Sequence, residues 1–411
     1  MSHAAPAPIA APPDPVRWRY VTLFLLAAAA LFFLRRPDAL LNPQLWAEDA
    51  VVFHAHADQS GLASLARPNT GYHHLAPRLV AYTASLLDPL HTPAIYNFAA
   101  ALIALATAAA ILRARWPGGP PVAWLAAASF VLVPHYSHEI FLNLTNVQWV
   151  LVSYLVLTLI CAPPLGRLAP TLTTAAVFIA GLTSPFSAAL LLLAVWRLWR
   201  SPTAAGRLVF ATLALTGLIQ TAATLTASQL ALPGTATTPI AAGPIAWLEV
   251  LGYRVALEMW LPPAAWPAHG HALAGALLAL GLLAAALWRG PARETRILLV
   301  ASFALFAIIS ALRIRPYLAE LADAGWGDRY FVPLRVWLMW VVALALPLLA
   351  GRWRALPWLA LAALTLATIP RYQGAAWTEK HWARYAPALR AGDPIDIPIN
   401  PSWTYHYPGR P

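Results

Sequence analysis

The segment "WRYVTLFLLAAAALFFLRR", residues 18–36, decides the fold class of this chain. From Tyr20 to Leu34 it carries no charged side chain, and arginines stand on both sides. A helix that crosses a lipid bilayer needs about 20 mostly apolar residues, within a range of roughly 17–25. This run, extended into its flanks, meets that requirement and predicts a first membrane-spanning helix over 18–34.

Composition points to the same class of protein. The chain has 411 residues, of which 60% are hydrophobic and 10% are charged. Soluble domains average about 45–50% apolar and about 25% charged residues. Cys161 is the only cysteine, which excludes an internal disulfide framework. We predict no cleavable signal peptide, because no small-residue cleavage site follows the first apolar run and further runs come after it.

Further apolar segments predict an all-α, polytopic integral membrane bundle of about 11 transmembrane or re-entrant helices. The stretch 171–200 is ambiguous, because it fits either one long helix kinked at Pro185 or two short helices in a hairpin. The predicted spans are 18–34, 94–112, 120–133, 147–160, 170–182, 186–199, 208–230, 270–288, 297–312, 334–350 and 356–369.

The distribution of charge predicts which way these helices run. With a cytoplasmic N-terminus, the short inner segments hold 13 arginines and two acids, so they carry the whole net charge of +11. This asymmetry follows the positive-inside rule, although Arg35 and Arg36 on the outer side run against it. Because the excess positive charge is distributed according to the two sides of the membrane, it also argues against nucleic acid as a partner.

The predicted domain organisation follows from these spans. Residues 1–17 form a disordered cytoplasmic tail, and 18–369 form the transmembrane domain, with long outer loops at 35–93, 231–270 and 313–333. Residues 370–411 are too polar to span the membrane and predict a cap on the outer face. Polar and aromatic residues concentrate in the outer segments. We therefore expect the functional site on the outer face of the bacterial inner (plasma) membrane.

The first outer loop opens with "LNPQLWAEDAVVFHAHADQSG", residues 41–61, in which Glu48 and Asp49 are adjacent acids. Two neighbouring carboxylates can raise one pKa by mutual repulsion, which suits a general base near neutral pH. The alternative is a solvated pair, or a pair bridged to Arg35, Arg36 or Arg78.

Two cationic stretches suit a phosphate group. "RPNTGYHHLAPRLVAYTASLLD", 67–88, contains His73, His74 and Arg78, for which the alternative is ordinary interfacial histidine and tyrosine. "RIRPYLAELADAGWGDRYFVPLRVW", 313–337, contains Arg329 and Tyr330. Its four arginines are expected to face the outer leaflet, or else to pair with nearby acids: Arg313, Arg315, Arg329 and Arg335 with Glu320, Asp323 and Asp328.

A third stretch, "PHYSHEIFLNLTNVQWV" at 134–150, is rich in hydrogen-bonding groups at the mouth of a helical hairpin. Such groups suit a sugar, and the alternative is a plain polar loop. The predicted sugar or acceptor contacts are His135, His138, Glu139, Asn143 and Asn146.

Several expected motifs are missing. No nucleotide-binding glycine motif, metal site or other cofactor site is predicted, and His54 and His56 are only weak metal candidates. No acid lies in the middle of an apolar span, where an ion-coupled transporter usually needs one. Glu249 and Glu258, which flank Arg254, predict an amphipathic interfacial helix.

The short motifs "WAEDAVVF", "GYHHLAPRLVAY", "GLTSPF" and "GDRYFVPL", with a tail containing "IPINPSW", resemble bacterial membrane glycosyltransferases of the GT-C type. The resemblance implies transfer of a sugar from a polyprenyl-phosphate donor to an acceptor hydroxyl of a glycan or lipid-linked acceptor, usually with inversion. It implies Asp49 as the base and Glu48 as its partner or an acceptor contact. It also assigns the donor phosphate to Arg329 and Tyr330, with the 73–78 segment beside them.

Many members of that group carry a soluble outer domain after the last span, whereas the segment after the last predicted span here has about 40 residues. Acceptor recognition would then fall to the tail of about 40 residues and to loop 231–270. A transporter or flippase of lipid-linked saccharides, which needs the same cations but no base, is the second hypothesis. A non-catalytic membrane scaffold is the third.

Overall fold

The computed structural model describes residues 14–137, 139–161, 168–230, 244–261, 269–288, 290, 292–314, 325 and 327–410. Most of the predicted N-terminal tail, parts of the outer loops 231–270 and 313–333, and His138 lie outside these residues. Of the tail, residues 14–17 are described, and Val16 among them is buried.

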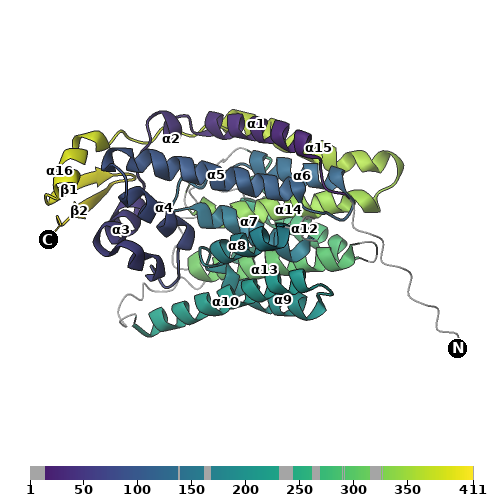
Figure 1. The fold of residues 1–411 in the computed structure, drawn as a ribbon. Helices are drawn as coiled ribbons and strands as arrows, with labels where there is room; N and C mark the ends of the chain where they lie inside the picture. The colour runs from purple at the N-terminus through teal and green to yellow at the C-terminus, as the bar shows by residue number, and fades with distance from the viewer. Residues whose placement is uncertain are drawn as a thin grey trace.

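Each predicted apolar span forms a helix, and together these helices make one elongated bundle (Figure 1). The segment predicted at 147–160 has the same bounds in the structure, and the other ends differ by a few residues. The bundle helices are α1 (Trp18–Arg35), α5 (Thr92–Arg113), α6 (Pro120–Leu132), α7 (Val147–Ile160), α8 (Ala169–Gly181), α9 (Phe186–Arg200), α10 (Ala204–Leu230), α12 (His269–Ala286), α13 (Arg293–Ile314), α14 (Val332–Ala345) and α15 (Leu356–Thr368).

Six helical segments within the described residues are long and apolar enough to cross a membrane, and four further apolar helices are shorter. The outward faces of the bundle are apolar too: Leu26 of α1 is 65% exposed, Leu277 of α12 is 70% exposed and Leu366 of α15 is 69% exposed. Soluble proteins rarely expose large apolar surfaces, whereas lipid contact requires them. The helices thus agree with the prediction of an all-α membrane bundle that contacts lipid.

The two ends of the bundle differ in chemistry. At one end, named here the arginine end, Arg113 donates a hydrogen bond of 2.5 Å to the Val16 carbonyl oxygen, and Arg197 pairs with Glu294 at 2.9 Å. The opposite end, named here the cap end, carries the first loop and the C-terminal elements (Figure 1). The segments predicted as inner and outer therefore gather at opposite ends.

The stretch 171–200 forms a hairpin of two helices, α8 and α9. Thr173 of α8 lines a cavity together with the first turn of α10, and the carbonyl oxygen of Gly181 accepts a hydrogen bond of 3.3 Å from Gln220 farther along α10. Arg197, near the end of α9, lies 4.9 Å over the ring of Phe210, back toward the start of α10. The chain therefore reverses between Gly181 and Phe186.

Shorter elements occupy the cap end. They are α2 (Asp38–Leu41), the π-helix η1 (Asp49–His54), α3 (Ala55–Ser60), η2 (Gly61–Ala66), α4 (Leu75–Ser85), η3 (Pro89–His91), α11 (Pro244–Leu251), η4 (Gly252–Leu257), η7 (Asp328–Tyr330), η10 (Ile369–Arg371), η11 (Trp382–Arg384) and α16 (Ala386–Ala391). Two 3₁₀ turns, η8 (Leu346–Leu348) and η9 (Gly351–Ala355), connect α14 to α15.

The tail also forms a two-stranded antiparallel sheet, β1 (Ile395–Ile399) and β2 (Trp403–Tyr407), which the sequence did not predict. Ile397 and Tyr405 lie opposite each other on the buried face of the sheet and belong to one buried cluster with Phe53 of η1. After β1, the Asn400 carbonyl oxygen accepts a hydrogen bond of 2.6 Å from the Ala47 amide. The tail thereby holds the loop that carries Glu48 and Asp49.

Candidate functional site

A cavity of about 290 Å³, lined by both polar and apolar residues, lies at the cap end and brings together segments that are far apart in the sequence. Its wall includes one acid, two arginines, two carboxamides and several aromatic rings. The lining residues are Glu48, Thr70, Tyr72, Thr145, Asn146, Gln148, Trp149, Pro185, Phe186, Thr224, Ile309, Ser310, Arg313, Arg329 and Tyr330.

The two adjacent acids lie in different environments. Glu48 is half-buried and lines the cavity. Asp49 is fully buried, and its carboxylate accepts hydrogen bonds from the Thr145 hydroxyl at 2.6 Å and from the Trp46 amide at 3.1 Å. Burial raises the pKa of Asp49 to about 7, against the opposing effect of the Thr145 hydrogen bond. The structure therefore presents Glu48, and not Asp49, to a ligand.

The helical turn at η1 explains this separation. Consecutive residues on a helix point in clearly different directions, so two adjacent side chains cannot share one direction. Ala47, just before them, has a φ of 41°, which turns the chain sharply into η1. Asp49 then points toward Thr145 and Glu48 toward the cavity.

Two arginines supply positive charge to the cavity. Arg329 forms an ion pair of 3.4 Å with Glu139, and its guanidinium lies 5.6 Å from the ring centre of Tyr330. Arg313, at the end of α13, is exposed, and no acid of the described chain forms an ion pair with it. Its guanidinium is free to bind an anionic group.

Hydrogen bonds and ring contacts hold the polar wall in place. Asn146 donates to the Glu139 carbonyl oxygen at 3.2 Å and accepts from the Trp149 indole at 3.1 Å. The rings of Trp149 and Tyr330 meet edge-on, with centres 4.8 Å apart. Side chains fixed in this way lose little freedom when a ligand binds.

A buried ion network positions Arg329 from behind the cavity. Arg335 lies 2.8 Å from Asp328 and also pairs with Glu258, while Arg254 pairs with Glu258 at 3.0 Å. All four side chains are fully buried. Arg335 therefore follows the alternative expectation, pairing with Asp328, and Glu258 is buried against two arginines inside the protein. Each of these charged side chains has an oppositely charged partner inside the protein, and this attraction offsets the free-energy cost of removing the charges from water.

The cationic stretch 67–88 lies beside the cavity without lining it, apart from Thr70 and Tyr72. His74 packs against the rings of Tyr72 and Phe53, and burial lowers its pKa to about 3. Arg78 is fully buried, and its guanidinium lies 3.2 Å from His56 Nδ1. The main chain of His73 pairs with the Gln220 side chain. These three predicted phosphate ligands instead support the wall that carries Tyr72.

Of the predicted sugar contacts, Asn146 lines the cavity and His138 lies outside the described residues. His135 and Asn143 are buried and do not line it, and the imidazole of His135 packs against Phe141. Glu139 is 8% exposed, and burial raises its pKa while the Arg329 charge opposes that rise. Glu139 thus acts on the cavity through Arg329.

Within the described residues, no three side chains of His, Cys, Asp or Glu lie together as metal ligands. His54 packs between the rings of Trp382 and Tyr405, and His56 contacts Arg78.

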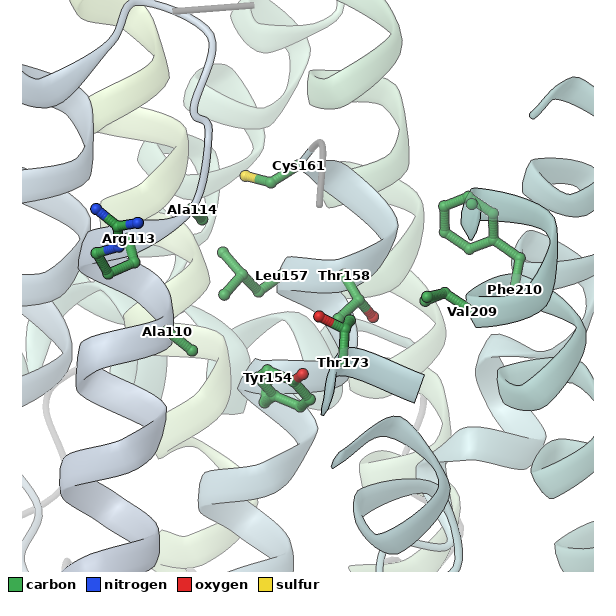
Figure 2. Close-up of a pocket in the computed structure, with 11 residues that line it drawn as sticks. Ala110, Arg113, Ala114, Tyr154, Leu157, Thr158, Cys161, Thr173, Val209 and Phe210 are labelled. Carbon is green, nitrogen blue, oxygen red and sulfur yellow. The ribbon is translucent and has the colours of Figure 1, made fainter. Parts of the chain in front are cut away.

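Another cavity, of about 90 Å³, lies at the arginine end among α5, α7, α8 and α10 (Figure 2). Its wall is mostly apolar, and among the described residues that line it Arg113 alone is charged. The Arg113 guanidinium is already bonded to the Val16 carbonyl oxygen. Without a carboxylate or a free cation, this cavity does not have the chemistry of the one at the cap end.

The chain matches no protein-family model, no curated protein and no solved structure. Its function must therefore be argued from the chemistry of the cap-end cavity.

Sequence reasoning did not select several residues that line this cavity. Gln148 belongs to the hydrogen-bonding groups noted in the stretch 134–150, whereas Trp149 beside it was not selected. Thr224 and Ser310 carry hydroxyl groups on apolar helices. Such residues commonly bond back to their own helix, as Thr224 does to the Gln220 carbonyl oxygen at 2.9 Å, so their position gave no functional signal.

Proposed function

We propose that this protein is a membrane glycosyltransferase that moves a sugar from a polyprenyl-phosphate donor to an acceptor hydroxyl, with Glu48 as the general base. One observation supports the proposal most directly. The Glu48 carboxylate and the guanidinium groups of Arg313 and Arg329 line one cavity, among carboxamides and aromatic rings.

Each group has a role in the proposed reaction. Glu48 takes the proton of the acceptor hydroxyl as its oxygen bonds to the anomeric carbon of the donor sugar. The bond between that carbon and the phosphate oxygen breaks, and the electron pair leaves with the lipid phosphate. Arg313 and Arg329 stabilise the negative charge that develops there, since guanidinium matches the geometry of phosphate oxygens. The base role moves from Asp49, as the resemblance implied, to its neighbour.

The wall also suits a sugar ring. Asn146 and Gln148 provide carboxamides that can donate and accept hydrogen bonds, and Trp149 and Tyr330 provide aromatic surface. Glu48, Arg313 and Arg329 line the same cavity, so a sugar bound there could be reached by both the acceptor and the phosphate.

The proposed site lies at the outer face of the membrane. Arginines gather at the opposite end of the bundle, and the positive-inside rule assigns that end to the cytoplasm. Apolar side chains of α9 and α13, Phe186 and Ile309, complete the cavity wall. A donor held in the outer leaflet by its lipid chain would meet the cavity from this side.

The test uses purified protein and polyprenyl-phosphate-linked glucose, mannose and galactose in turn, with water as the minimal acceptor of the sugar and release of polyprenyl phosphate as the readout. We expect release from at least one donor, and a loss of about 10²–10⁴-fold in Glu48→Gln, the range typical of general-base catalysis. Glu294→Gln, an acid-to-amide change at the arginine end, serves as the matched control. Full activity in Glu48→Gln would exclude Glu48 as the base.

A flippase of lipid-linked saccharides would use the same cations and aromatic rings. Arg313, which is exposed and forms no ion pair with the described acids, fits that function as well, because binding an anionic headgroup needs no base. Movement of the labelled lipid across proteoliposomes, unchanged in Glu48→Gln, would favour the flippase.

A further inference from the structure

A second polar depression, of about 380 Å³, separates the first loop from the C-terminal tail at the cap end. We name it the tail groove, and it is lined chiefly by Asn42, Gln44, Glu379, His381, Trp382 and Arg384. We propose that the tail groove binds the glycan portion of the acceptor. The assignment of that glycan as an acceptor rests on the proposed function, whereas glycan binding itself does not.

The floor of the tail groove is rigid. Gln44 is 3% exposed, and its side chain donates to Glu379 at 3.3 Å and accepts from the Lys380 amide at 3.0 Å. Asn42 donates a second hydrogen bond to the Glu379 carboxylate. Two segments more than three hundred residues apart in the sequence are thus fastened together by side chains, which prepares the groove for a ligand.

The backbone at His381 is held in an unusual conformation. Its φ of 56° and ψ of 42° lie in the left-handed region, which residues other than glycine rarely occupy. The His381 amide donates a hydrogen bond of 2.5 Å to Glu379, which fixes this conformation, and the side chain stays 52% exposed. Strain of this kind concentrates at ligand-binding sites. Here it keeps an imidazole at the groove.

The mixture of groups at the tail groove suits a neutral sugar. Arg384 is exposed and pairs with no acid in the described part of the chain, so it can donate hydrogen bonds to a ligand. Glu379 beside it can accept them, and its negative charge disfavours an anionic ligand such as a lipid phosphate. Sugar hydroxyls both donate and accept, and therefore need both kinds of partner.

The tail groove also lies close to the proposed base. Glu48 stands four positions after Gln44 in the sequence, so their Cα atoms are at most about 14 Å apart. Between them Trp46 stacks on Trp377, with ring centres 4.5 Å apart, and gives the path an aromatic surface. A glycan lying in the groove could extend one hydroxyl toward Glu48.

The test measures binding without turnover, in purified Glu48→Gln protein in detergent micelles. Cellotriose, maltotriose and mannotriose are the probes, and saturation-transfer NMR gives the dissociation constants. We add His381→Gly and Arg384→Ala separately to this background. Glycine adopts a positive φ without strain, so His381→Gly removes the imidazole and should not lower the thermal midpoint. Arg390→Ala is the control, because Arg390 pairs with Asp88 and does not line the groove.

We expect at least one trisaccharide to bind, with affinity at least fivefold weaker in both groove variants and unchanged in the control. Unchanged affinity in both groove variants, or no binding of any of the three probes to the parent protein, would overturn the proposal. If groove-dependent binding is found but the wild-type protein releases no polyprenyl phosphate, the glycan site stands and the transferase proposal fails. If the wild-type protein releases polyprenyl phosphate but binds no trisaccharide, the transferase proposal stands and the glycan site fails.

Discussion

The hydroxyl of Thr145 donates a hydrogen bond of 2.6 Å to the carboxylate of Asp49, and Thr145 also lines the cavity that Glu48 faces. Asp49 is thus separated from the cavity by a single side chain. This arrangement makes Asp49 a positioning residue and leaves Glu48 as the acid that can contact substrate.

The first prediction concerns the two acids. Asp49→Asn should retain sugar transfer within about tenfold of the wild type, far from the loss expected for Glu48→Gln. The asparagine amide can donate to Thr145, whose hydroxyl then turns to the Trp46 carbonyl oxygen 3.4 Å away. Release of polyprenyl phosphate under saturating donor measures both variants. The reverse order of the two losses would return the base role to Asp49.

The second prediction concerns Arg313. Arg313→Gln should weaken donor binding about 10–100-fold, because a hydrogen bond to a charged group contributes about 1.5–3 kcal/mol. Titration with polyprenyl phosphate alone, followed by intrinsic fluorescence, measures the affinity directly. Arg352→Gln, at the arginine end, is the control and should bind as the wild type does. Equal affinities in all three proteins would remove Arg313 from the phosphate site.

The third prediction concerns the buried ion network. Arg335→Met should lower the free energy of unfolding by about 3–5 kcal/mol, because Asp328 and Glu258 lose a buried partner. Arg197→Met breaks the half-exposed pair with Glu294 and should cost less than about 1 kcal/mol. Thermal unfolding in detergent compares the two. A similar small effect for both would show that the network contributes little to stability.

The fourth prediction concerns pH. Burial raises the pKa of Asp49 to about 7, so the folded state favours the protonated form of this acid. The stabilisation from that form is fully present below about pH 4 and is lost as the pH rises through about 7. The thermal midpoint of the wild type should therefore fall between pH 5 and pH 8. The fall should be smaller in Asp49→Asn, and an identical fall would contradict the raised pKa.

Much of the fold was predictable because the apolar runs are long. In segments such as 94–112 and 208–230, hydrophobicity alone predicts a helix, since a backbone in lipid must satisfy its own hydrogen bonds. The hairpin at 171–200 was left open, because a proline fits either a kink or a turn. The contacts of Gly181 and Arg197 with α10 resolved it.

The site was less predictable. Glu48, Arg329, Tyr330 and Asn146 were selected from the sequence and do line one cavity. The segment around Arg78 was also selected, yet it packs behind the wall, because clustering along the chain does not report which way a side chain points. Polar residues from α10 and α13 enter the cavity from distant parts of the chain.

Hydrophobic run length and the placement of arginines, both local properties, were sufficient to predict the helical membrane bundle and its polar cap end. The choice between adjacent residues needed long-range packing. Glu48 faces the cavity and Asp49 faces Thr145 because Thr145 begins the approach to α7, about a hundred residues later, and occupies one side of the loop. A one-residue step along a helix turns the side chain to a different direction, and only neighbours from elsewhere in the fold determine which of the two directions leads to a ligand.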